Sequence, residues 1–97
     1  MNREQQEKYF KEFTKRMADT MLKKGNDYAN TDRLSNFKLA GNICQTSAKI
    51  NCLNQIANKV ARLGVLLNST EVNNESIEDS ILDLANYSVL LGMILSE

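Results

Sequence analysis

The sequence predicts an all-α protein, a small bundle of three long helices and one shorter helix. Proline is absent from its 97 residues, glycine occurs four times, and no run alternates β-branched and polar residues as a strand would. Hydrophobic residues make up 42% and charged residues 25%, which are ordinary values for a globular protein. We expect one domain over residues 1–97. Because so short a chain buries little surface alone, we also expect a homo-oligomer.

The first helix is expected over about residues 3–24. Four apolar side chains recur there at three- and four-residue steps, which places them on one face: Phe10, Phe13, Met17 and Met21. Gly25 is expected to end the helix, after two lysines whose charge suits its carbonyl end.

The segment from Gly25 to Asn42 is dense in Asn, Asp, Gly and Ser, which favour turns. Its interspersed aromatic and leucine side chains indicate that the loop is packed down. A short helix is expected within it, from Asp32 or Ser35 to Leu39.

The longest helix is expected over about residues 45–68, and the last over about 75–95. The predicted core stripe of the longest helix, flanked by Ala57 and Gly64, consists of Leu53, Ile56, Val60, Leu63 and Leu67. The predicted core face of the last helix consists of Ile77, Ile81, Leu84, Ser88, Leu91 and Leu95.

Several classes of protein are disfavoured. No apolar run approaches the roughly 20 residues of a membrane span, and the charged N-terminus argues against a signal peptide, so a cytoplasmic protein is expected. The spacing of Cys44 and Cys52 suggests two reduced thiols without chemistry. Because histidine is absent, any metal would be held by oxygen atoms, which favours Mg²⁺ or Mn²⁺.

Charge is balanced overall but unevenly distributed along the chain. Residues 1–68 hold all 12 Lys and Arg against six Asp and Glu, whereas residues 69–97 hold six acids and no base. A balanced chain gains little from releasing the counterions of a nucleic acid, so coating of DNA or RNA is not expected. A small anionic ligand remains compatible with this distribution.

The last helix carries an acidic stripe. Glu75, Asp79 and Asp83 lie one turn apart, Asn86 continues the stripe, and Glu78 points to its side. The helix dipole accounts for acids in the first turn but not for Asp83.

A positive partner is therefore expected opposite the stripe, and two candidates remain open. One is an internal ion-pair network with Lys59 and Arg62 of the long helix. The other is a divalent cation that bridges the carboxylates to the phosphates of a ligand.

The loop region presents groups suited to a nucleotide, since aromatic rings stack on bases while amide and cationic groups bind base edges or phosphates. The alternative is a capped connector that two aromatic rings hold down. The candidate ligand-binding residues of this region are Lys24, Asp27, Tyr28, Asn36 and Phe37.

Three blocks of the sequence read together are familiar: KKGNDYAN with SNF, NKVARLGVLL, and NESIEDSILDLANYSVLL. The sequence resembles the nucleotide modification associated domain family of phages and prophages. In that family, K-x-x-D-Y, K-x-x-R-L and E-S-I-x-D-x-x-x-D-L-A-N-Y segments recur in this order. The resemblance covers most of the chain from Lys23 to Leu91, and its last block is the most specific.

That family is in turn similar to the all-α nucleoside-triphosphate pyrophosphatases of the MazG and dimeric dUTPase kind. The resemblance implies a helical oligomer in which carboxylates hold Mg²⁺ and activate water against a nucleotide. It places Glu75 and Asp79 in the catalytic role, with Asp83 as a further metal ligand. It also implies that Lys59 and Arg62 face phosphate.

The sequence departs from the pyrophosphatases in one respect. Their preceding helix supplies a further E-x-x-E pair, but residues 45–68 contain no Asp or Glu. Hydrolysis would need the missing ligands from elsewhere, and the candidates are Glu12, Asp19 and Asp27.

Three functions follow as alternatives. The protein is a Mg²⁺-dependent pyrophosphohydrolase, a non-catalytic sponge that sequesters a nucleotide signal of host defence, or a structural helical interaction module.

Overall fold

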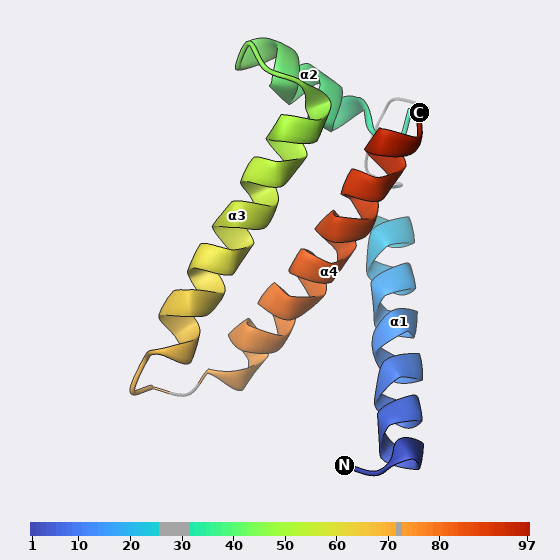
Figure 1. Cartoon of the computed structure of the whole chain (residues 1–97), viewed down its shortest axis with the longest axis vertical. Coiled ribbons are helices and arrows are strands. Elements are labelled where there is room, and N and C mark those ends of the chain that lie inside the picture. Colours follow the sequence, from blue (N-terminus) through green and yellow to red (C-terminus); the bar gives the residue numbers. More distant parts are fainter. Residues whose placement is uncertain (26–31, 72) are drawn as a thin grey trace. The chain divides into compact units, whose positions relative to one another are not determined.

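The structure is a computed structural model that describes residues 1–25, 32–71 and 73–97, with the backbone alone at residues 24 and 25 (Figure 1). Its described residues form four helices and no strand, which confirms the all-α prediction. None of the helices in this part of the chain is long and apolar enough to cross a membrane.

The chain divides into two compact units, residues 1–31 and residues 32–97, which we describe separately as unit 1 and unit 2. The expectation of a single domain stays a prediction.

Unit 1 contains one helix, α1 (Arg3–Gly25), close to the predicted bounds. Its start is closed by a reciprocal pair of hydrogen bonds. The backbone N–H of Gln5 donates to Oδ1 of Asn2 at 2.9 Å, and the backbone N–H of Asn2 donates to Oε1 of Gln5 at 2.8 Å. This capping box satisfies two of the donors that a helix start leaves unpaired.

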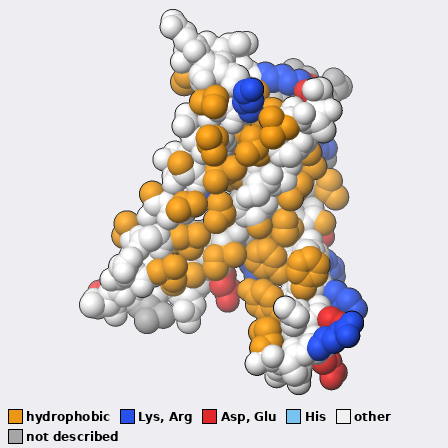
Figure 2. All heavy atoms as spheres, viewed as in Figure 1, with side chains coloured by type: hydrophobic (Ala, Val, Ile, Leu, Met, Phe, Trp, Pro, Cys, Tyr) orange, Lys and Arg blue, Asp and Glu red, His pale blue; other side chains and the backbone are white. Residues whose placement is uncertain are grey.

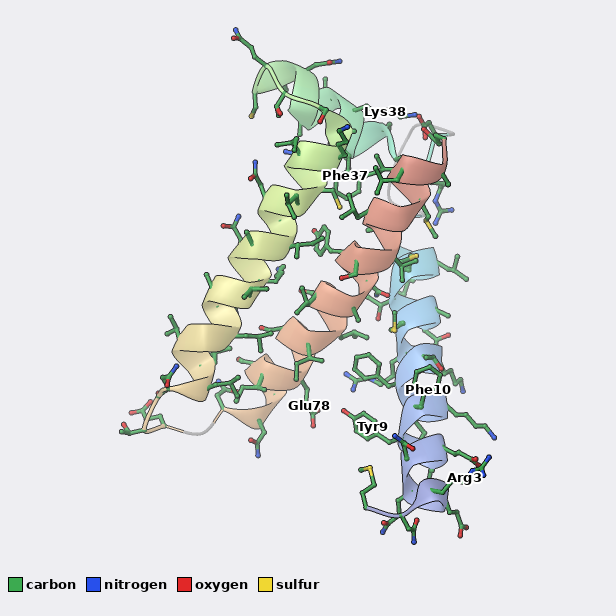
Figure 3. The ribbon with its side chains drawn as sticks, in the orientation of Figure 1. Arg3, Tyr9, Phe10, Phe37, Lys38 and Glu78 are labelled. Carbon is green, nitrogen blue, oxygen red and sulfur yellow. The ribbon has the colours of Figure 1, made fainter. Side chains whose placement is uncertain are left out.

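Aromatic side chains occupy the first half of α1 (Figure 3). The rings of Tyr9 and Phe13, one turn apart, stack with their centroids 6.0 Å apart. Of the four residues in the predicted apolar stripe, Phe13, Met17 and Met21 are half-buried, while Phe10 is exposed.

Unit 2 contains three helices: α2 (Ser35–Ile43), α3 (Ala48–Leu67) and α4 (Asn74–Ser96). Helices α3 and α4 lie side by side and antiparallel, and α2 packs against α3 at its N-terminal end (Figure 1). The short turn after α3 allows this hairpin of helices, since two antiparallel helices need only a few connecting residues.

Both long helices of unit 2 begin at a polar cap. Oγ of Ser47 accepts a hydrogen bond from the backbone N–H of Ile50 at 3.2 Å, and Oδ1 of Asn73 accepts one from that of Ser76 at 3.1 Å. Each bond satisfies one otherwise unpaired donor of the first turn. Helix α4 consequently begins one residue earlier than the sequence pattern predicted.

The turn between α2 and α3 corrects one predicted boundary. Gln45 was expected to begin the longest helix, but its φ of 56° places it in the left-handed region after α2. The N–H of Thr46 donates to the carbonyl of Gly41 at 2.7 Å, and that of Gln45 to the carbonyl of Asn42 at 3.1 Å. These two bonds form a Schellman motif, which ends α2 and turns the chain into α3.

Helix α2 itself runs past the predicted end at Leu39 and includes Gly41. At this glycine the helix comes close to the start of α3. A Cβ atom at Gly41 would lie 2.9 Å from the backbone carbon and 3.0 Å from the backbone oxygen of Ser47. Glycine is therefore required here by close approach of two backbone segments rather than by a special φ.

The predicted core stripes are only partly correct. In α3, Ile56 and Leu63 are half-buried, but Leu53, Val60 and Leu67 are exposed. The 3.6-residue period shows which residues share a helix face, but not how much of that face another element covers. In α4, the exposed residues of the predicted core face are Ile81, Ser88 and Leu95.

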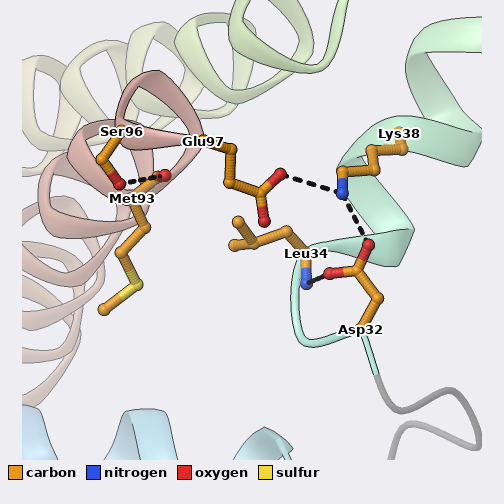
Figure 4. Close-up of polar contacts among 6 residues, drawn as sticks. All are labelled: Asp32, Leu34, Lys38, Met93, Ser96 and Glu97. Carbon is orange, nitrogen blue, oxygen red and sulfur yellow. Dashed lines mark hydrogen bonds and ion pairs between the residues drawn. The ribbon is translucent and has the colours of Figure 1, made fainter.

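The segment before α2 is tied to the end of α4 by Lys38 (Figure 4). Its Nζ lies 2.6 Å from Oδ2 of Asp32 and 2.9 Å from Oε2 of Glu97. The hydrogen bond from Lys38, together with one from the backbone N–H of Leu34, lowers the pKa of the Asp32 carboxyl below its ordinary value. The hydrogen bonds to Asp32 and Glu97 in turn raise the pKa of Lys38.

Substitution of Gly41 by alanine is expected to destabilise unit 2 by about 1–3 kcal/mol, because the new methyl group would force two backbone segments apart. Gly92→Ala in α4 is the matched control, since a Cβ there meets nothing within 4 Å. Its gain in helix propensity is expected to stabilise by up to about 1 kcal/mol. Urea unfolding followed by circular dichroism measures both, and equal effects of the two substitutions would contradict the close approach.

Removal of Lys38 is expected to change how stability depends on pH. Because the pKa of Asp32 is lower in the folded state, its carboxylate stabilises the fold at pH values above its ordinary pKa of 3.8. This stabilisation is lost as the pH falls through the folded-state pKa. The urea midpoint of the wild type should therefore exceed that of Lys38→Met at pH 6, and the difference should shrink below about pH 3.8. Lys49→Met, at an exposed lysine of α3, should show no such convergence. A difference that stays constant down to pH 2 would contradict this role of Lys38.

Candidate functional site

Unit 2 brings together three of the predicted site residues from different helices, Phe37, Lys59 and Asp83, and two of them form an ion pair. Nζ of Lys59 in α3 lies 3.2 Å from Oδ2 of Asp83 in α4, and the two side chains are 27% and 29% exposed. Lys59 is thus the positive partner that the position of Asp83 called for. Arg62, the other candidate, is exposed and makes no ion pair with another described residue.

Two aromatic rings complete the surroundings of this ion pair. Nζ of Lys59 also lies 5.9 Å from the ring centroid of Tyr87, one helical turn after Asp83. The ring of Phe37 in α2 meets that of Tyr87 edge to face, with the centroids 6.1 Å apart and the planes at 87°. We call these four residues, Phe37, Lys59, Asp83 and Tyr87, the Lys59 cluster. All three helices of unit 2 contribute to it.

A buried thiol fixes the backbone beneath the cluster. Sγ of Cys52 in α3 is fully buried and donates to the carbonyl oxygen of Tyr87 at 3.5 Å. Burial raises the pKa of this thiol above its ordinary value of 9.0, so it stays protonated at neutral pH. Cys52 acts here as a small apolar residue with a weak donor. The other cysteine, Cys44, is exposed, and both are free.

The acidic stripe is not gathered into one site in this structure. Glu75 and Asp79 are exposed in the first two turns of α4, where the helix dipole favours carboxylates. Glu78 lies near the start of α4 and Phe37 toward the other end (Figure 3). Among the described residues, no three His, Cys, Asp or Glu side chains come together as a metal site would require. Magnesium binding by Glu75, Asp79 and Asp83 stays a prediction.

The remaining predicted residues lie in different surroundings. Asn36 is exposed on α2, and Asn86 is buried in α4. At Lys24 only the backbone is described, while Asp27 and Tyr28 lie outside the described residues. The predicted contribution of the Tyr28 loop to a ligand site is therefore untested.

Sequence reasoning missed two residues that connect elements of unit 2, Tyr87 within the Lys59 cluster and Lys38 outside it. Tyr87 follows Asp83 by four residues, a spacing that places both on one side of a helix. That spacing was a usable signal. Lys38 offered none, because its partners Asp32 and Glu97 lie six and 59 positions away along the chain.

The chemistry of these groups suits an anion that carries a ring. A half-buried ammonium group beside an aromatic face attracts phosphate oxygens, and the rings of Tyr87 and Phe37 provide faces or edges for a base. Asp83 holds Lys59 in place and also competes with any incoming anion for its charge.

Lys59 and Asp83 should be coupled energetically. Because both side chains are partly exposed, we expect a double-mutant cycle of Lys59→Met and Asp83→Asn to give about 0.5–1 kcal/mol of coupling in urea unfolding. The same cycle with Lys49→Met in place of Lys59→Met should give none. Coupling below about 0.2 kcal/mol for the first pair would contradict the contact.

Comparison with known proteins adds no relative. No family model, curated protein or solved structure matches this chain. The resemblance to the nucleotide modification associated domain family stays a prediction from the residues quoted above.

Proposed function

We propose that this protein binds a nucleotide or a nucleotide-derived molecule at the Lys59 cluster, and that it captures this ligand rather than cleaving it. The observation that carries the proposal is the position of Lys59 Nζ, 3.2 Å from a carboxylate oxygen and 5.9 Å from the Tyr87 ring centroid. A phosphate group would bind the ammonium group, while the base would lie against the aromatic rings.

Capture accords better with the described carboxylates than cleavage does. Cleavage by magnesium-activated water needs carboxylates that hold the metal beside the phosphates. Here Asp83 pairs with Lys59, and Glu75 and Asp79 are exposed nearer the start of α4. The basic side chains of α3 and the resemblance to a phage family support a sponge for a nucleotide signal of host defence.

Binding is tested with nucleoside mono-, di- and triphosphates, cyclic nucleotides and ADP-ribose, each with and without Mg²⁺. A ligand should raise the melting temperature of the full chain by mass action and bind stoichiometrically in calorimetry. Lys59→Met should weaken this binding at least ten-fold, since it removes the charge that meets phosphate. Lys49→Met, on the same helix, should leave binding within about two-fold of wild type.

Asp83→Asn distinguishes the two roles of the carboxylate. If the ligand binds Lys59 directly, the substitution removes a competitor and should tighten binding about three- to ten-fold. If Asp83 instead holds magnesium, the same substitution should weaken binding, and only when Mg²⁺ is present.

Chromatography after protein denaturation decides between capture and cleavage. Complete recovery of the intact ligand supports capture. Conversion of a triphosphate to monophosphate and pyrophosphate, with loss of this activity in Asp79→Asn, would contradict capture. The protein would then be a pyrophosphohydrolase. If none of these ligands binds or is cleaved, both capture and cleavage are contradicted. The remaining hypothesis is then the structural interaction module.

A further inference from the structure

Helix α3 carries a second apolar face that its own unit does not cover. Six residues at alternating three- and four-residue steps form it, and we call them the α3 stripe: Ile50, Leu53, Ala57, Val60, Gly64 and Leu67. This spacing is that of the a and d positions of a helix-pairing seam, repeated over 18 residues and about 27 Å of helix.

All members of the α3 stripe are exposed. The exposed fractions of the four larger residues, Ile50, Leu53, Val60 and Leu67, are 42%, 49%, 53% and 67%. The residues that α3 turns toward the rest of unit 2 lie on a separate face, about 130° around the helix from the α3 stripe. This face includes the buried Cys52 and the half-buried Gln55, Lys59 and Leu63. Hydrophobic side chains follow both α3 and α4 on the face seen in Figure 2.

We propose that the α3 stripe binds the α3 stripe of a second copy, antiparallel, about a two-fold axis between Asn58 and Lys59. The proposal is independent of ligand binding at the Lys59 cluster. A second copy of the same stripe is the partner we infer, because three properties make the stripe complementary to itself. These are the pairing of large with small side chains, the lack of charge within the stripe and the regular spacing.

Size pairing favours the antiparallel arrangement. With the axis between residues 58 and 59, Ala57 faces Val60 of the second copy and Leu53 faces Gly64, so that each larger side chain meets a small one. The end layers pair Ile50 with Leu67. A parallel pair would instead place Ala57 on Ala57 and Gly64 on Gly64, and two layers would be left poorly filled.

The edges of the stripe carry one charge, that of Lys49 beside Ile50, and the antiparallel arrangement places it level with the uncharged Asn68 of the second copy. The neighbours on its solvent side are Asn54, Ala61 and Asn68. Lys59 pairs with Asp83, and Arg62 lies on the opposite side of α3 from the stripe. Interface centres are depleted in charged residues, and the α3 stripe shares this property.

Sedimentation equilibrium of the full chain tests the proposal directly. The wild type should have the mass of a dimer, twice 11.0 kDa. Val60→Glu places two like charges beside the axis and should raise the dimer dissociation constant by at least about a hundred-fold. Val65→Glu is the matched control, because Val65 is 72% exposed outside the stripe, and it should leave the constant within about three-fold.

A size exchange keeps the proposal testable if Val60→Glu fails to fold. Val60→Ala leaves two small residues face to face, and Ala57→Val places two valines face to face, so each alone should weaken the dimer about ten-fold. The double substitution restores one valine against one alanine and should return the constant to within about three-fold of wild type. In a parallel pair, each substitution would act on its own layer and the double would not recover.

Three results would overturn the proposal. One is a monomeric wild type at 100 µM, which would mean that another part of the same chain covers the stripe or that nothing does. The second is an oligomer whose dissociation constant Val60→Glu and the size exchange leave unchanged, which would place the interface elsewhere. The third is a double substitution that fails to recover although circular dichroism shows it folded.

Discussion

The packing of α3 against α4 at Tyr87 is the contact on which the rest of unit 2 depends. The carbonyl oxygen of Tyr87 accepts a hydrogen bond from the buried thiol of Cys52, and its ring contacts both Lys59 and Phe37. One residue of α4 therefore contacts both α2 and α3. Without it, α2 would be joined to α4 by the exposed ion pair of Lys38 with Glu97, and such pairs stabilise little.

In the proposed function, the same atoms of the Lys59 cluster stabilise unit 2 and bind the ligand. An ion pair that is about three-quarters buried needs both partners, because removal of one leaves the other poorly solvated. The same partial burial makes the ammonium group a stronger attractor for an anion than a fully solvated lysine would be. Asp83 thus orders Lys59 and, in the proposed function, is the residue that an incoming phosphate must displace.

The chain buries few hydrophobic side chains and leaves many large ones exposed. Among the described residues, the buried hydrophobic side chains are Leu34, Cys52 and Leu82. So small a core gives limited stability to a chain of this length. Pairing of two copies through the α3 stripe would add burial without new secondary structure, and it would leave the Lys59 cluster on another face of α3.

The sequence by itself determined the helices. The absence of proline, the apolar periodicity and the polar residues between the periodic segments gave the all-α class and most helix bounds, because these depend on local backbone preferences. The two boundaries that failed, the end of α2 at Leu39 and the start of α3 at Gln45, lie on either side of a Schellman motif. This motif places Gln45 in the left-handed region, where glycine is the usual residue. Only the tertiary structure decided that Lys59 rather than Arg62 meets Asp83, that Tyr87 joins three helices, and that Leu53, Val60 and Leu67 stay exposed. Spacing along a helix shows which residues share a face, but which face meets which partner depends on contacts between residues far apart in the chain.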